Sequence, residues 1–271
     1  MKKQAVQQPS EWVEPLARLG YAAKGVVYGI VGLLAAQAAV SAGGRTTDTQ
    51  GALGAIVTQP FGKVLLSLVA IGLIGYVVWR FVQAIKDPEN KGTDAKGLVQ
   101  RLGYAGNGLI YASLALSAVK LVLGSGSGTN SNSTEDATAR LLSQPFGQWL
   151  VGTGGAFIIG LGFYQFYKAF TAKFRKEMNL SQLSDTEKNW VTFIGRFGLA
   201  ARGVVFCVIG FFLIQAARHS DASKARGSGE ALKALEQQPY IPWVLGIVAV
   251  GLVAYGIYMI IQARYRHFVT K

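Results

Sequence analysis

The sequence predicts an all-α integral membrane protein with six transmembrane helices, arranged as three parallel two-helix repeats in a pseudo-threefold bundle. Three observations predict this fold class. Hydrophobic residues make up 51% of the chain and charged residues only 15%, whereas soluble domains carry roughly 25% charged residues. The apolar residues form six long blocks, and one pattern of blocks occurs three times. The composition therefore excludes a disordered chain or a disulfide scaffold and favours a membrane protein.

Six segments have the length of about 20 mostly apolar residues that a transmembrane helix needs. None of them contains Asp or Glu. The predicted helices are residues 19–40, 62–85, 102–123, 147–170, 194–217 and 241–262. The first segment follows Lys2 and Lys3, as a signal peptide would. It is longer than the apolar region of a signal, however, and it has two counterparts later in the chain, so we interpret it as a retained helix.

An internal repeat organises these segments. The odd helices open with the pattern Arg-x-Gly-x-Ala-x-x-Gly, which begins at Arg18, Arg101 and Arg196. The even helices are preceded by a Gln-Pro pair, which lies at residues 59–60, 144–145 and 238–239. The register holds over two helices in each copy, so the chain divides into an N-terminal tail and three repeats. The tail is residues 1–15, and the repeats are residues 16–88, 98–173 and 190–266.

The repeats predict the topology. Two helices return the chain to its starting side, so all three copies share one orientation and are parallel rather than inverted. Three such pairs can close around an axis normal to the membrane, with a linear or asymmetric packing as the alternative. Most of the 27 Lys and Arg residues fall on the side of the two termini. Positive residues favour the cytoplasmic side, which predicts a cytoplasmic location for both termini.

The openings at Arg18, Arg101 and Arg196 and the Gln-Pro-Phe-Gly sequences at residues 59–62 and 144–147 carry a resemblance. They resemble the bacterial membrane family known as domain of unknown function 1206, over about residues 12–266. The resemblance implies tandem two-helix repeats and a multi-pass protein of the bacterial inner (plasma) membrane. It implies no activity.

Two polar layers recur in the odd helices. The first consists of the opening arginines Arg18, Arg101 and Arg196, and the second of Lys24, Asn107 and Arg202. The second layer lies about 9 Å deeper, because a helix rises about 1.5 Å per residue. Basic side chains inside a span are costly unless they reach the headgroups or line a wet cavity. We interpret both layers as candidate contacts to a permeation path or, alternatively, to lipid headgroups.

Small residues form a stripe on the same helices and predict close helix–helix packing. The glycines of this stripe are Gly25, Gly29, Gly108, Gly203 and Gly210. A path lined by backbone is the alternative interpretation. Cys207 also lies on the stripe, and as the single cysteine of the chain it cannot form an intrachain disulfide.

The connections between the helices also carry signals. Short amphipathic stretches before each Gln-Pro pair are typical of helices on the outer membrane surface. Residues 124–134 form a Gly/Ser/Asn linker. A capping box from Ser184 to Glu187 predicts a short surface helix ahead of the third repeat.

The sequence holds no phosphate loop, metal cluster or catalytic constellation, so we expect neither an enzyme nor a cofactor or metal. The net charge of +13 needs no nucleic acid as its partner, because the bilayer and its anionic lipids attract basic residues near the cytoplasmic leaflet. The preferred hypothesis is a channel or transporter for an anionic solute along the repeat axis. The alternative is a non-transporting membrane protein that binds anionic lipid or scaffolds a partner.

Overall fold

The computed structural model describes residues 13–40, 46–88, 91–125, 133–181, 183–236 and 242–266. Within these ranges the chain is helical apart from its connections and one isolated β-bridge between Met178 and Arg266. The elements are α1 (Val13–Ala39), α2 (Thr49–Val57), α3 (Gly62–Lys86), α4 (Ala95–Val122), α5 (Ser133–Leu142), α6 (Gly147–Thr171), η1 (Lys173–Glu177), α7 (Asp185–His219), η2 (Ala222–Lys224), α8 (Ser228–Glu236) and α9 (Pro242–Tyr265).

Six helices of the described chain are long and apolar enough to cross a membrane, namely α1, α3, α4, α6, α7 and α9. Their outer surfaces carry large apolar side chains; Leu68, Leu109 and Phe163 are 55%, 64% and 64% exposed. A surface of this kind suits lipid rather than water. The predicted all-α, six-span fold is thus confirmed, and the protein is a multi-pass membrane protein.

The Gln-Pro-Phe-Gly sequences form a tight turn between a short helix and a span. Phe61 and Phe146 adopt left-handed backbone angles, with φ of 58° and 63°, directly before α3 and α6. A Cβ atom on Gly62 would lie 2.3 Å from the carbonyl oxygen of Ile56. The position therefore accepts only glycine, because the end of α2 approaches the start of α3 so closely.

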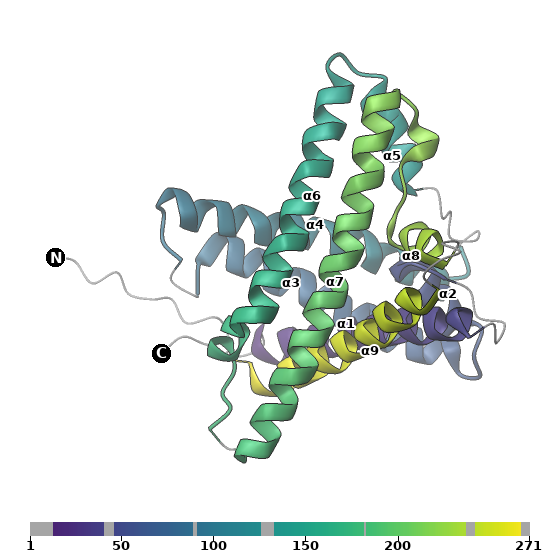
Figure 1. Cartoon of the computed structure of the whole chain (residues 1–271). Helices are drawn as coiled ribbons and strands as arrows, with labels where there is room; N and C mark the ends of the chain where they lie inside the picture. Colours follow the sequence, from purple (N-terminus) through teal and green to yellow (C-terminus); the bar gives the residue numbers. More distant parts are fainter. Residues whose placement is uncertain are drawn as a thin grey trace.

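The contacts between spans follow the order that three repeats predict, and in Figure 1 the pair α6 and α7 stands at a steep angle to the pair α1 and α9. Each even helix lies against the odd helix of the next repeat: α3 against α4, α6 against α7, and α9 against α1. Within repeats 1 and 3 the two helices also pack, α1 against α3 and α7 against α9. In the described chain, α4 and α6 of repeat 2 do not form such a packed interface. The ring is therefore open at one of its corners.

The expected short surface helix after Ser184 is not a separate element. Ser184 and Glu187 do form the predicted capping box, with the Ser184 side chain accepting from the backbone N–H of Glu187. The helix that they start, however, continues unbroken as α7 to His219. No proline interrupts residues 185–219, so nothing ends the helix before the span begins.

Some expectations lie outside the described residues. These include residues 126–132 of the predicted linker, residues 1–12 of the N-terminal tail, and the third Gln-Pro pair at residues 238–239. The short helices α2, α5 and α8 occupy the three amphipathic stretches that precede the even spans.

Candidate functional site

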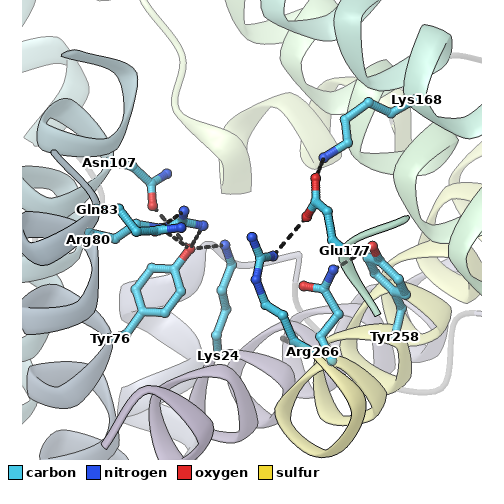
Figure 2. A network of polar contacts seen from close by, with 10 residues as sticks. Lys24, Tyr76, Arg80, Gln83, Asn107, Lys168, Glu177, Tyr258 and Arg266 are labelled. Atoms are coloured by element: carbon cyan, nitrogen blue, oxygen red, sulfur yellow. Dashed lines mark hydrogen bonds and ion pairs between the residues drawn. The ribbon is translucent and has the colours of Figure 1, made fainter. Parts of the chain in front are cut away.

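Polar side chains from several spans meet in the interior of the bundle. We define the cationic centre as Lys24 of α1, Arg80 of α3 and Arg202 of α7. Lys24 is only 2% exposed, while Arg80 and Arg202 are half-buried. Two members of the second predicted polar layer, Lys24 and Asn107 of α4, meet at the hydroxyl of Tyr76 (Figure 2). The third, Arg202, lies beside the Tyr255 ring, which it shares with Lys24.

The hydroxyl group of Tyr76 is the hub of this network. It accepts a hydrogen bond of 3.0 Å from Nζ of Lys24 and one of 2.8 Å from Nε of Arg80. A second guanidinium nitrogen of Arg80 also donates to it, and the hydroxyl donates to Oδ1 of Asn107 at 3.1 Å. A phenol oxygen has two lone pairs. Three N–H donors therefore compete for the two acceptor positions of this hydroxyl, while a further nitrogen of Arg80 donates to Oε1 of Gln83 at 2.8 Å.

Aromatic rings enclose the ammonium group of Lys24. Its Nζ lies 4.8 Å from the ring centroid of Tyr76, 4.7 Å from that of Tyr111 and 5.8 Å from that of Tyr255. Rings within about 6 Å attract a cation through their quadrupole. Tyrosine thus stabilises a charge that would otherwise be costly to bury, without supplying a negative partner.

Arg202 repeats this arrangement in the third repeat. Its guanidinium donates a 2.9 Å hydrogen bond to the hydroxyl of Tyr255. Tyr255 is the repeat equivalent of Tyr76, as Arg202 is of Lys24. Nε of Arg202 is buried and has no hydrogen-bond acceptor in the described chain. Repeats 1 and 3 therefore each supply one basic residue paired with one tyrosine.

In the part of the chain that the structure describes, no carboxylate forms an ion pair with Lys24, Arg80 or Arg202. Glu177 lies beside the centre but forms ion pairs with two other cations (Figure 2). Its carboxylate oxygens lie 3.4 Å from Nζ of Lys168 and 3.0 Å from a guanidinium nitrogen of Arg266. The interior consequently carries an excess of positive charge.

The three opening arginines have a partner that neither sequence interpretation foresaw. Each binds backbone carbonyl groups at the C-terminal end of the even helix against which its own helix packs. Arg18 donates to the carbonyl of Ala263 at 2.8 Å, and Arg101 to the carbonyls of Ala84 and Ile85 at 2.8 and 2.9 Å. Arg196 donates to the carbonyl of Phe170 at 3.2 Å. The last carbonyl groups of a helix lack internal partners and carry partial negative charge, so these arginines act as C-caps.

The glycine stripe lies in the interfaces between neighbouring repeats. A Cβ atom on Gly25 would lie 2.7 Å from the carbonyl oxygen of Gly256 in α9. The corresponding distances are 3.0 Å from Gly203 to the oxygen of Gly162 and 2.5 Å from Gly210 to that of Gly155.

The other two glycines of the stripe are less confined. Gly108 faces Arg80 and Phe81 of α3 at 3.3–3.4 Å, and Gly29 approaches Gly256, whose own Cβ atom would lie 2.8 Å from the Gly29 nitrogen. A Cβ atom on Gly29 itself would meet no heavy atom within 4 Å. Gly25, Gly203 and Gly210 thus lie where the backbones of adjacent spans come closest, whereas Gly29 and Gly108 do not require glycine as strictly.

Sequence reasoning missed the tyrosines and Arg80 as parts of the site. A signal was present: Tyr76 and Tyr255 occupy equivalent positions, and repeat 2 has Leu161 there. The same repeat carries Asn107 where the others carry a basic residue. Among the described residues, no group of three or more His, Cys, Asp and Glu side chains could hold a metal ion.

Comparison with known proteins agrees with the repeat architecture. The family described as Domain of Unknown Function (DUF1206) matches the chain three times, at residues 19–87, 102–172 and 197–266. The chain is 40% identical over 261 residues to "Uncharacterized protein YxxB" of Bacillus subtilis (strain 168), covering 96% of this chain and 94% of that protein. No solved structure matches the chain.

Proposed function

We propose a function from the cationic centre, because the chain belongs to the family described as Domain of Unknown Function (DUF1206) and that description assigns no activity. The protein binds an anion at Lys24, Arg80 and Arg202 and passes it across the membrane along the repeat axis. The observation that carries the proposal is the sharing of one neutral acceptor, the Tyr76 hydroxyl, by two cations.

Lys24 and Arg80 hold two positive charges close together. Nζ of Lys24 and Nε of Arg80 both bind the same oxygen, so they lie within two hydrogen-bond lengths of each other. Two unit charges about 6 Å apart repel each other by about 3 kcal/mol at an effective dielectric constant of about 20. An anion between them would replace this repulsion with attraction and supply the acceptors that the donors lack. Anion binding therefore accounts for a grouping of charges that is otherwise unfavourable.

The position of the cationic centre inside the spans supports transport. Ionisable residues inside membrane spans commonly mark a route for ions or substrates. The centre lies in the interior of the bundle and takes side chains from α1, α3, α4, α7 and α9. Bulky side chains of the same region, such as Trp79 and Tyr255, are at most 2% exposed. We therefore propose a carrier that must rearrange to release its anion, rather than an open channel.

We also propose that the protein resides in the bacterial inner membrane with both termini in the cytoplasm. The distribution of Lys and Arg supports this orientation. The basic flanks of the spans are suited to contact anionic lipids. Fusions of a reporter that is active only in the cytoplasm to each terminus should both be active.

Anion flux into liposomes that contain the purified protein tests the proposal. Two variants, Lys24→Asn and Arg202→Asn, place at each position the residue that repeat 2 carries naturally. We expect each to lower chloride or phosphate flux at least tenfold. Lys63→Gln removes an exposed positive charge at the start of α3 and serves as the matched control. Equal flux in all four proteins would reject a path through the cationic centre. Anion binding that depends on Lys24 without any flux would favour the non-transporting alternative.

A further inference from the structure

The two helices of a repeat pack closely in repeats 1 and 3, through a glycine and a tyrosine. A Cβ atom on Gly20 would lie 2.5 Å from the backbone nitrogen of Tyr76, and one on Gly198 would lie 2.5 Å from that of Tyr255. In both repeats this contact directs the tyrosine toward the basic residue of the same repeat, Lys24 or Arg202. Close helix packing and the cation–tyrosine pair therefore occur together.

Repeat 2 has small residues at the same positions, but in the described chain no neighbouring helix packs against them. A Cβ atom on Gly103, Gly106 or Gly160 would have no heavy atom within 4 Å. Large apolar residues on the same stretches of α4 and α6 are exposed: Val99 by 67%, Leu102 by 63%, Phe157 by 65% and Leu161 by 37%. We call the stretches of α4 and α6 that carry these residues the repeat-2 opening. It is the corner at which the ring of spans fails to close.

Asn107 places one edge of the repeat-2 opening next to the cationic centre. It directly follows Gly106 in α4 and accepts a hydrogen bond from the hub hydroxyl of Tyr76. Across the opening, α6 contributes Lys168, whose side chain is 22% exposed. Figure 2 shows Asn107 and Lys168 on opposite sides of the network, with Lys24 between them. Leu161 provides no hydroxyl where Tyr76 and Tyr255 do, so this corner lacks the acceptor that the other two corners have.

We infer that the repeat-2 opening is a lateral entrance, through which the anionic headgroup of a membrane lipid reaches Lys24, Arg80 and Arg202 while its tail stays between α4 and α6. Charge complementarity and the apolar character of the opening carry this inference. The centre requires an acceptor of negative charge, and the flanking valine, leucines and phenylalanine suit an acyl chain. The inference rests on the proposed anion binding and names its substrate as an anionic amphiphile.

Binding measurements on the full-length protein in detergent micelles test the inference with two probes. Fluorescent phosphatidylglycerol represents an anionic lipid, and inorganic phosphate represents the same charge without a tail. Gly103→Phe places a ring in the opening, where the structure has free space, and leaves every member of the cationic centre in place. Gly54→Phe makes the same change at an equally open glycine in α2 and is the matched control.

We expect Gly103→Phe to weaken phosphatidylglycerol binding at least tenfold while phosphate binding stays unchanged, and Gly54→Phe to alter neither. Unchanged lipid binding in Gly103→Phe, or an equal loss of both probes, would overturn the lateral entrance. Phosphatidylcholine that binds as tightly as phosphatidylglycerol would overturn the anionic character of the ligand. The proposed function fails separately, if Lys24→Asn and Arg202→Asn bind both anionic probes as the native protein does. Circular dichroism and gel filtration of each variant verify that it is folded.

Discussion

The ammonium group of Lys24 donates a 3.0 Å hydrogen bond to the hydroxyl of Tyr76, and both side chains are at most 2% exposed. A buried lysine whose acceptor is a neutral phenol loses that hydrogen bond when the phenol is removed, and its buried ammonium group is then costly. The tyrosine is equally constrained, because Gly20 of the neighbouring helix lies directly against its backbone. Helix packing in repeat 1 and the position of the buried charge are therefore one structural arrangement.

Removing the hub hydroxyl should destabilise the protein more than removing a hydroxyl with a neutral partner. In Tyr76→Phe, Lys24 and Arg80 lose their shared acceptor, and an unsatisfied buried donor costs about 1–3 kcal/mol, more if it is charged. Thermal unfolding in detergent measures the loss. Tyr258→Phe is the control, since within the described chain its hydroxyl accepts from the neutral amide of Gln262 and from no cation. Equal losses in the two variants would contradict the role of Tyr76 as the hub.

The capping arginines should matter for stability and not for anion binding. Arg101→Gln removes two charge-assisted hydrogen bonds to the end of α3, which predicts a loss of about 1–2 kcal/mol. Phosphate affinity should remain within twofold of the native value, because no hydrogen bond links Arg101 to the described members of the cationic centre. Arg140→Gln, which removes an exposed arginine of α5, is the matched control. A variant of Arg101 with native stability and lost binding would assign Arg101 to the anion path instead.

Equivalent glycines should respond differently to alanine in repeats 1 and 2. A Cβ atom on Gly75 would lie 2.4 Å from the carbonyl oxygen of Leu16, so Gly75→Ala forces α1 and α3 apart. Overpacking of this kind costs about 1–3 kcal/mol. Gly160→Ala, at the equivalent position in the repeat-2 opening, should be neutral or stabilising by up to about 1 kcal/mol through reduced backbone entropy. Chemical unfolding measures the free energy of unfolding of both variants. A comparable loss in Gly160→Ala would mean that α4 and α6 pack together.

Much of this architecture is predictable from the sequence, and the rest depends on which helices become neighbours. Hydropathy and the threefold pattern predict the six spans and bring Lys24, Asn107 and Arg202 to one level. The capping role of Arg18 could not be foreseen, because its carbonyl partner Ala263 is distant in the chain and becomes adjacent only when α9 packs against α1.

The opening in repeat 2 is hidden for a different reason. Gly103 and Gly160 preserve the small residues of a close contact, so the pattern suggests packing that does not occur. Leu161, at the position of Tyr76 and Tyr255, is the departure in sequence that coincides with the open corner.

Glu177 should limit the anion affinity of the centre. It neutralises part of the local positive charge through Lys168 and Arg266, and its side chain is 32% exposed. Glu177→Gln removes that negative charge without changing the shape of the side chain. The variant should bind phosphate about fivefold more tightly, equivalent to about 1 kcal/mol, and the gain should shrink as salt screens it. Isothermal titration calorimetry at two salt concentrations provides the measurement.

The control for Glu177→Gln is Asp185→Asn, which removes an equal charge from a side chain that is 94% exposed and pairs with Lys188. It should leave phosphate affinity unchanged, because exposed charges in water act weakly over distance. Glu177→Gln will also be less stable without ligand, since Arg266 is 7% exposed and loses a carboxylate partner. Saturating phosphate should restore part of that stability, because a ligand that binds only the folded state stabilises it. Weaker phosphate binding in Glu177→Gln would mean that Glu177 positions the cations rather than competing with the anion for them.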